Sequence, residues 1–195
     1  MVDSKLGVRS VQEFIEKIKA NPGKYNYGAS QTGSLHHIFM ASFLKSKDLD
    51  MVRVPYAKGA AESMQAVLAG DIQAFVTGYL MAQPHVETGR FVRLLGSTQR
   101  RSVFDPATPT LADVGMKESF NGDVGYLAPA GTPRSVVDKL SAALAEAVKN
   151  PAYVEKMKGF AIEATYQGPD ALGELVRSDF DMFKRAAKSI GLTNN

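Results

Sequence analysis

The first 95 residues alternate between helical and strand-like hydrophobic patterns. Ser10 and Glu13 are spaced as in a capping box, and the apolar residues that follow recur at helical spacing until Asn21-Pro22-Gly23. Four short apolar runs predict strands, at 25–29, 51–54, 72–76 and 91–95. Helical patterns follow the first two of these, with apolar positions at Leu35, Ile38, Phe39 and Phe43 and at Met64, Val67 and Leu68. Because strands alternate with helices, we expect an α/β fold with a mostly parallel sheet.

The polar, turn-rich stretch MKESFNGD then marks a change in composition and predicts a boundary after residue 119. Beyond it, strands are expected at 125–128 and 162–165, and helices at 151–158 and 169–189. A further helix is expected to be capped by Thr132, to have Pro133 at its first position, and to bury one face formed by Val136, Val137, Leu140, Leu144 and Val148. The sequence thus predicts two parts, 1–119 and 120–195.

Composition narrows the function classes. The 195 residues include no cysteine, which excludes disulfides, thiolate metal sites and cysteine nucleophiles. The net charge of +3 is spread along the chain without a basic run, so nucleic acid is not expected as a partner. No apolar run approaches the ~20 residues of a membrane span, and MVDSKLGVRS lacks the apolar centre of a signal peptide.

The loop after the first long strand suggests an anion site. Gly28 and Gly33 stand five positions apart and precede Ser34, as in a phosphate-binding P-loop, but the lysine of that motif is missing. What remains is a turn of small residues that leads into a helix N-terminus, with hydroxyls at Ser30, Thr32 and Ser34, and this suits one carboxylate better than a triphosphate. A purely structural role is the alternative, because glycine and serine are common in tight turns.

A second loop strengthens the anion hypothesis. Lys58 precedes Gly59, Ala60 and Ala61, which again place small residues between a strand and a helix. In an open parallel sheet both loops lie at the carboxyl ends of strands, where ligands bind. Two helix N-termini that converge there would form a clamp for an anion.

Other chemistry finds little support in the sequence. The three histidines are His36, His37 and His85, and two adjacent helical residues point about 100° apart, so a shared metal ion is not expected. The serines lack the glycine pattern of a hydrolase elbow, and no paired carboxylates lie near either loop. We therefore expect no catalytic residues, no metal and no cofactor.

Four motifs in order carry a family resemblance: NPGKYNYGASQTGSLHH, VPYAKGAAESMQAVLAGDIQAFV, PTLADVG and LAPAGTP. Together they resemble the extracytoplasmic solute receptors of tripartite tricarboxylate transporters, also called the Bug family. The resemblance extends from about Val8 to Gly191. It implies a two-lobed fold of the type 2 periplasmic-binding-protein kind that closes on a small carboxylic acid in the periplasm and delivers it to the membrane subunits of the transporter. It also implies a receptor and not an enzyme.

Site residues follow from the same resemblance. Carried over by motif, one loop of the cleft is formed by Ser30, Thr32, Gly33 and Ser34, and the other by Gly59, Ala60 and Ala61. Thr77, at the end of the strand at 72–76, is a further candidate ligand-binding residue. In that family, loop backbone groups, hydroxyls and bridging waters hold the carboxylate more than arginine or lysine does.

The start of the chain resembles a segment that lies inside other family members, after a signal peptide and a first half-lobe. Residues 1–119 would then be one nearly complete ligand-binding lobe, and 120–195 the C-terminal part of the other. A lobe without its partner segment leaves apolar surface and sheet edges uncovered, which favours a homo-oligomer. Two alternatives to the receptor fragment stay open: an assembly module that does not bind solute, and a small α/β enzyme acting on an anionic substrate.

Overall fold

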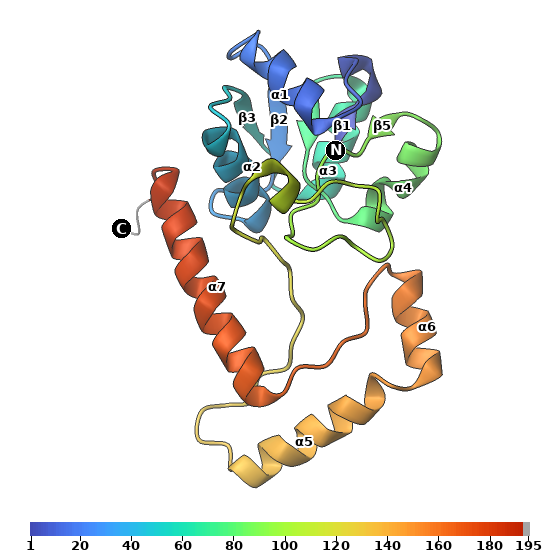
Figure 1. Ribbon diagram of the computed structural model, residues 1–195, viewed down its shortest axis with the longest axis vertical. Coiled ribbons are helices and arrows are strands. Elements are labelled where there is room, and N and C mark those ends of the chain that lie inside the picture. Colours follow the sequence, from blue (N-terminus) through green and yellow to red (C-terminus); the bar gives the residue numbers. More distant parts are fainter. Residues whose placement is uncertain (193–195) are drawn as a thin grey trace. The chain divides into compact units, whose positions relative to one another are not determined.

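The computed structural model describes residues 1–192, which form two compact units (Figure 1). One unit contains Met1–Asn121 and the end of the chain from Arg185, and the other contains Gly122–Lys184. The division after Asn121 lies close to the boundary that composition predicts after residue 119. That the two parts are lobes of a receptor stays a prediction.

The first unit is built on a five-stranded sheet in the order β3-β2-β4-β1-β5. Its strands are β1 (Val2–Asp3), β2 (Asn26–Ala29), β3 (Val52–Pro55), β4 (Ala74–Phe75) and β5 (Phe91–Val92). The helices and 3₁₀ turns of this unit are η1 (Ser4–Leu6), α1 (Val11–Lys19), α2 (Leu35–Ser46), α3 (Ala60–Ala69), α4 (Tyr79–Glu87) and η2 (Ala112–Val114). The predicted α/β class is therefore confirmed.

The sheet is parallel except for one inserted strand. Strand β2 pairs in parallel with both β3 and β4, whereas β1 is antiparallel to β4 and to β5. The sequence did not indicate β1, since two residues are too short to show an alternating pattern. Its Asp3 is buried but compensated, because it accepts a hydrogen bond from Lys5 N at 2.9 Å and lies 3.4 Å from Arg90.

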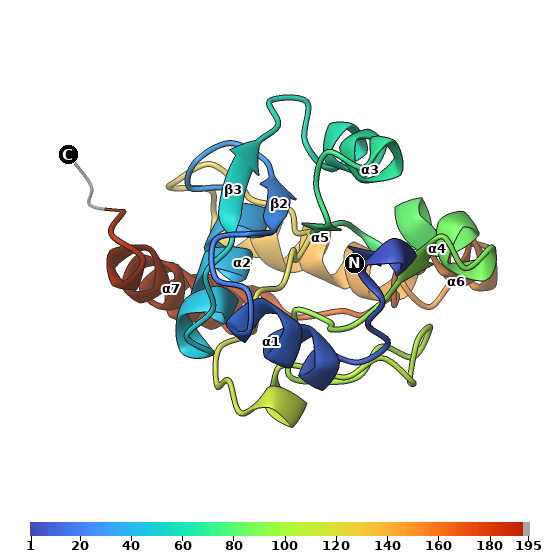
Figure 2. The same ribbon diagram turned by 90° about the horizontal axis from the view of Figure 1, so that it is seen from above.

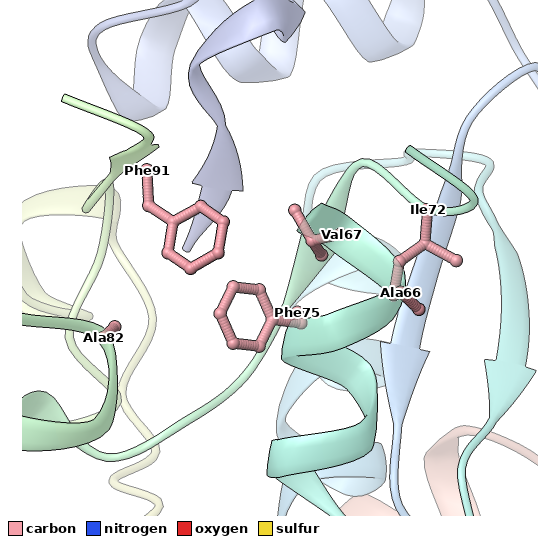
Figure 3. Close-up of a cluster of buried hydrophobic side chains, with 6 residues drawn as sticks. All are labelled: Ala66, Val67, Ile72, Phe75, Ala82 and Phe91. Atoms are coloured by element: carbon pink, nitrogen blue, oxygen red, sulfur yellow. The ribbon is translucent and has the colours of Figure 1, made fainter. Parts of the chain in front are cut away.

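Helices cover both faces of this sheet, as Figure 2 shows with α1 and α3 on opposite sides of β2 and β3. On one face, α3 and α4 pack on the central strands through a buried cluster (Figure 3) made of Ala66, Val67, Ile72, Phe75, Ala82 and Phe91. The rings of Phe75 and Phe91 meet edge to face, with centroids 5.2 Å apart. On the other face, α1 and α2 contribute Phe14 and Phe43, whose rings stack.

Gly28 allows α3 to approach β2 closely. A Cβ atom at this position would lie 2.6 Å from Ile72 Cδ1 and 2.8 Å from Ser63 Cβ, closer than packed carbon atoms tolerate. Only a residue without a side chain fits between the strand and the helix. The glycine that resembled the first glycine of a P-loop therefore has a packing role.

The second unit consists of α5 (Arg134–Ala147), α6 (Pro151–Gly159) and most of α7 (Pro169–Ser189). Pro133 is the residue before α5, and no side chain caps this helix. The expected cap is wrong, because the Thr132 hydroxyl donates instead to the carbonyl of Pro129 at 2.8 Å. An exposed bidentate pair joins Arg134 to Asp170 at 3.1 and 3.2 Å.

Two expected strands and one expected buried face are wrong in this unit. Residues 125–128 and 162–165 are irregular, since no other strand within residues 1–192 pairs with them and an isolated strand leaves its backbone groups without partners. Helix α5 buries none of its residues, and Leu140 is 55% exposed. No residue in 122–181 is buried. The local pattern produced helices, but nothing in the described chain covers their apolar sides.

Within residues 1–192, no helix is both long and apolar enough to cross a membrane.

Candidate functional site

The two predicted loops leave the same edge of the sheet, side by side. Parallel pairing of β2 with β3 sets Ala29 opposite Pro55, so both strands end together. The N–H of Tyr56 donates to the carbonyl of Ala29 at 2.9 Å, and this bond holds the starts of the two loops next to each other. A Cβ atom on Gly59 would lie only 3.7 Å from the Ser30 hydroxyl oxygen. The geometry thus brings together the loop at 30–34 and the helix start at 59–61.

The 30–34 loop is held by its own hydrogen bonds. Ser34 is the N-cap of α2, and its Oγ accepts a bond from the N–H of His37 at 3.3 Å. The N–H of Gly33, a residue with φ of 82°, donates to His37 Nδ1 at 3.1 Å, and the N–H of Ser34 donates to the carbonyl of Gln31 at 3.0 Å. These two N–H groups already have acceptors, one in α2 and one in the loop. The hydroxyls of Ser30, Thr32 and Ser34 add side-chain donors toward a ligand.

The start of α3 keeps free donors. Gly59 is its N-cap with φ of 81°, and no side chain caps the helix. The N–H groups of Gly59 and Ser63 donate to backbone carbonyls at 3.0 and 3.2 Å, and that of Lys58 donates to the Glu62 carboxylate at 3.0 Å. No such bond within residues 1–192 uses the N–H of Ala60 or Ala61. Since a helix N-terminus carries partial positive charge, these two groups can receive an anion.

Arg53 is the charged residue of this region that the sequence analysis missed. From β3 its guanidinium donates to Thr32 Oγ1 at 2.9 Å and to the carbonyl of Ser30 at 3.4 Å. No carboxylate pairs with it in the described part of the chain. Arg53 stands directly before Val54 and Pro55, at the end of a predicted strand. This position could have marked it as a candidate site residue, since strand ends supply ligand-binding side chains.

The two neighbouring histidines, His36 and His37, lie in the first turn of α2, next to the loop. Burial lowers the pKa of His36, and burial together with the positive charge of Arg53 lowers the pKa of His37. Nδ1 of His37 must be unprotonated to accept from Gly33, which agrees with this direction. Arg53 brings a positive charge into contact with the 30–34 loop, and the helix starts add partial positive charge.

Thr77 lies apart from this pair of loops. Strand β4 adjoins β2 on the side away from β3, so Thr77 follows the same sheet edge one strand further along. Its hydroxyl donates to Met81 Sδ at 3.2 Å, and none of its hydrogen bonds within residues 1–192 reaches the 30–34 loop or the start of α3. Thr77 lines a separate cavity of about 290 Å³ that none of the other seven predicted site residues touches.

The arrangement resembles a binding site more than a catalytic one. Ser30 Oγ lies 3.4 Å from His36 Nδ1, but no carboxylate orients this imidazole among the contacts of residues 1–192, so a hydrolytic triad is not formed. Across the described residues, histidine and acidic side chains do not gather into a metal-binding cluster. An α/β sheet whose strand ends present small residues, hydroxyls and helix N-termini defines a class of small-anion binding proteins.

Comparison with known proteins shows to which family of small-anion binding proteins the chain belongs. Residues 1–192 match the sequence pattern of the tripartite tricarboxylate transporter family receptor, so the chain belongs to that family. A UPF0065 protein in the gbd 5' region of Cupriavidus necator is 30% identical over 185 residues, which are 95% of this chain and 56% of that protein. Members of the family are solute receptors, in agreement with the expectation that the chain is not an enzyme.

Solved structures agree in fold. A periplasmic transporter protein superimposes with a TM-score of 0.79 at 28% identity, covering 98% of this chain and 64% of the other. The Rpa4515 protein of R. palustris, solved with adipate, superimposes with a TM-score of 0.78 at 24% identity, covering 97% and 64%. The chain thus spans slightly more than half of that curated relative and about two thirds of these structures.

Proposed function

We propose that this chain is the ligand-binding part of an extracytoplasmic receptor that captures a small organic carboxylate. The observation that carries the proposal is the placement of the 30–34 loop beside the start of α3. One side offers hydroxyls and the guanidinium of Arg53, and the other offers the free N–H groups of Ala60 and Ala61. A carboxylate between them would gain several charge-assisted hydrogen bonds.

Each predicted residue has a role in this proposal. The hydroxyls of Ser30, Thr32 and Ser34 donate to the ligand, and Gly33 permits the left-handed turn that directs them. Gly59 keeps the start of α3 open, while Ala60 and Ala61 present their N–H groups. Thr77 binds a more distant part of the same ligand from the end of β4.

The cellular role follows from the family. The receptor would act in the periplasm and pass its ligand to the membrane subunits of a tripartite tricarboxylate transporter. Adipate, which is bound in the R. palustris relative, has two carboxylates on a short chain and is a reasonable first probe.

Isothermal titration with di- and tricarboxylates, amino acids and aromatic acids tests the proposal, with adipate as the first ligand. A variant pair sharpens it, because Ala61 is exposed in the first turn of α3. Ala61→Asp adds a negative charge that favours the helix but repels a bound carboxylate, and should weaken binding by at least about tenfold. Ala61→Asn has the same size without the charge and should bind within about twofold of the parent.

The proposal fails if none of these acids binds to folded protein. It also fails if Ala61→Asp and Ala61→Asn bind with equal affinity, since the ligand would then lie elsewhere. Circular dichroism confirms that each variant is folded before its titration is interpreted.

Assembly is the second candidate function, and the exposure of the second unit favours it. Val124, Tyr126 and Leu127 are 92, 79 and 87% exposed, and the apolar side of α5 is uncovered as well. Apolar surface of this kind favours association with a second copy of the chain. Light scattering after gel filtration would show a concentration-dependent dimer, and a monomer at all concentrations would exclude this role.

A further inference from the structure

The unit that contains the sheet holds a cavity of about 290 Å³ between β4, helices α1 and α2, and the segment at 94–110. It lies apart from the paired loops described above and shares only Thr77 with the predicted site residues. An apolar cavity of ~150 Å³ is large enough to bind benzene, and small-molecule pockets begin near ~300 Å³. The volume therefore suits a small organic molecule with one ring or a short alkyl chain.

The deep wall of this cavity is apolar. Phe14, Phe39 and Phe43 line it with their rings, and each has less than a tenth of its surface exposed. Leu94, also buried, adds to this wall from the segment after β5. An occupant with an apolar body would remove this surface from water, and each added methylene contributes about 0.8 kcal/mol.

Of the two charged side chains that line the cavity, one has no partner in the described part of the chain. Asp105 and Arg100 both line the cavity, but the Asp105 carboxylate is paired with Arg93 at 2.7 Å. The guanidinium of Arg100 has no hydrogen-bond acceptor or acidic partner among residues 1–192. Arg100 is exposed, so it can reach an anion at the mouth of the cavity.

We propose that this cavity is a second binding site, for a monocarboxylate with an apolar body. The body occupies the phenylalanine-lined space, and the carboxylate pairs with Arg100 at the rim. Ser97, which also lines the cavity, adds a hydroxyl to its lining. Thr77 is the one predicted site residue that lines this cavity, and none of the residues of the paired loops at 30–34 and 59–61 does, so the two proposals are tested with separate variants.

Titration with straight-chain monocarboxylates from butanoate to octanoate tests the apolar wall. The Kd should fall about fourfold with each added methylene, until the cavity is filled. Adipate, which has a charge at each end, should not bind here. A Kd that is independent of chain length, or absence of octanoate binding at millimolar concentration, would overturn the proposal.

Two variants, titrated with octanoate, test the charged residue at the rim of the cavity and the apolar interior of the cavity. Arg100→Gln should raise the Kd about five- to tenfold, because it removes a charge-assisted hydrogen bond. Arg9→Gln is the matched control, since Arg9 is also exposed and does not line the cavity. Ala74→Leu fills the cavity from β4 and should abolish binding; if this variant does not fold, Arg100→Gln still decides.

The same titrations separate this site from the receptor site. Ala61→Asp should leave octanoate binding unchanged, and Arg100→Gln should leave adipate binding unchanged. Loss of octanoate binding in Ala61→Asp, or equal binding of octanoate to Arg100→Gln and Arg9→Gln, would place the acid at the loops and overturn the cavity site.

Discussion

Helices α3 and α5 both carry apolar residues at helical spacing, yet they differ in what they bury. Helix α3 buries Ala66 and Val67 against the sheet, whereas Val136 and Leu140 of α5 remain 45 and 55% exposed. The same difference separates the two units. The first unit has a sheet with a buried core on both faces, whereas no residue of the second unit between 122 and 181 is buried. Helix formation needs a local pattern, but a core needs a second layer.

Truncation of a core side chain should show most strongly that the first unit has a buried core and the second does not. Phe75 is 1% exposed, and Phe75→Ala should cost about 3–5 kcal/mol in the free energy of unfolding through lost burial and a cavity. Leu140→Ala, in the exposed face of α5, should change it by less than about 0.5 kcal/mol. Urea unfolding followed by circular dichroism measures both. A large loss from Leu140→Ala would mean that the face of α5 is covered in solution.

A methyl group at Gly28 should have the next largest effect. Gly28→Ala forces α3 away from β2, because the new Cβ would overlap Ile72 and Ser63, and should cost about 1–3 kcal/mol. Gly78→Ala is the matched control, since a Cβ there meets nothing within 4 Å and its φ is −66°. The two melting temperatures compare the variants directly. Equal melting temperatures would contradict the close packing of α3 on β2.

Acid should destabilise the sheet unit through His37. Its pKa is lowered by burial and by Arg53, so the unfolded chain binds a proton more readily than the folded one. Stability from this group is complete above the unfolded pKa of about 6.5 and is lost as the pH falls from there through the lower folded pKa. Thermal melts between pH 7.5 and 5 measure how the melting temperature changes with pH. His37→Gln should make the melting temperature depend less on pH. An unchanged pH dependence would mean that other groups cause the acid destabilisation.

The smallest effect is expected from the ion pair in the second unit. The Arg134 guanidinium lowers the pKa of Asp170, but both side chains are more than 60% exposed. Solvent and salt screen such pairs, so Asp170→Asn should leave the melting temperature unchanged within error. A clear fall in the melting temperature of Asp170→Asn, measured in 0.1 M salt, would show that the pair is shielded from solvent.

Much of the sheet unit could be predicted from local signals. Capping residues and apolar spacing located α1, α2 and α3, and the order of strands and helices indicated parallel pairing of β2 with β3. Strand β1 could not be predicted, because its place depends on β4 and β5 lying on either side of it. The strands expected at 125–128 and 162–165 failed for the related reason that a strand needs a partner that the pattern does not supply.

The candidate site was predicted in part. Small residues marked both loops, and hydroxyls marked the loop at 30–34. The adjacency of the two loops is as expected, although their role in ligand binding stays a prediction. Arg53 was missed because its meaning depends on where the 30–34 loop folds back. The separation of Thr77 from the loops also depends on strand order, which places β4 on the other side of β2.

By itself, the sequence determined the helices, the strands of the parallel sheet, the family and the two small-residue loops, because these depend on neighbouring residues and on motif order. Only the tertiary structure decided which apolar faces are buried, that Arg53 reaches the loop, and that Arg100 stands at the rim of a phenylalanine-lined cavity. Burial and pairing are properties of residues distant in the chain, and so they follow from packing and not from local pattern.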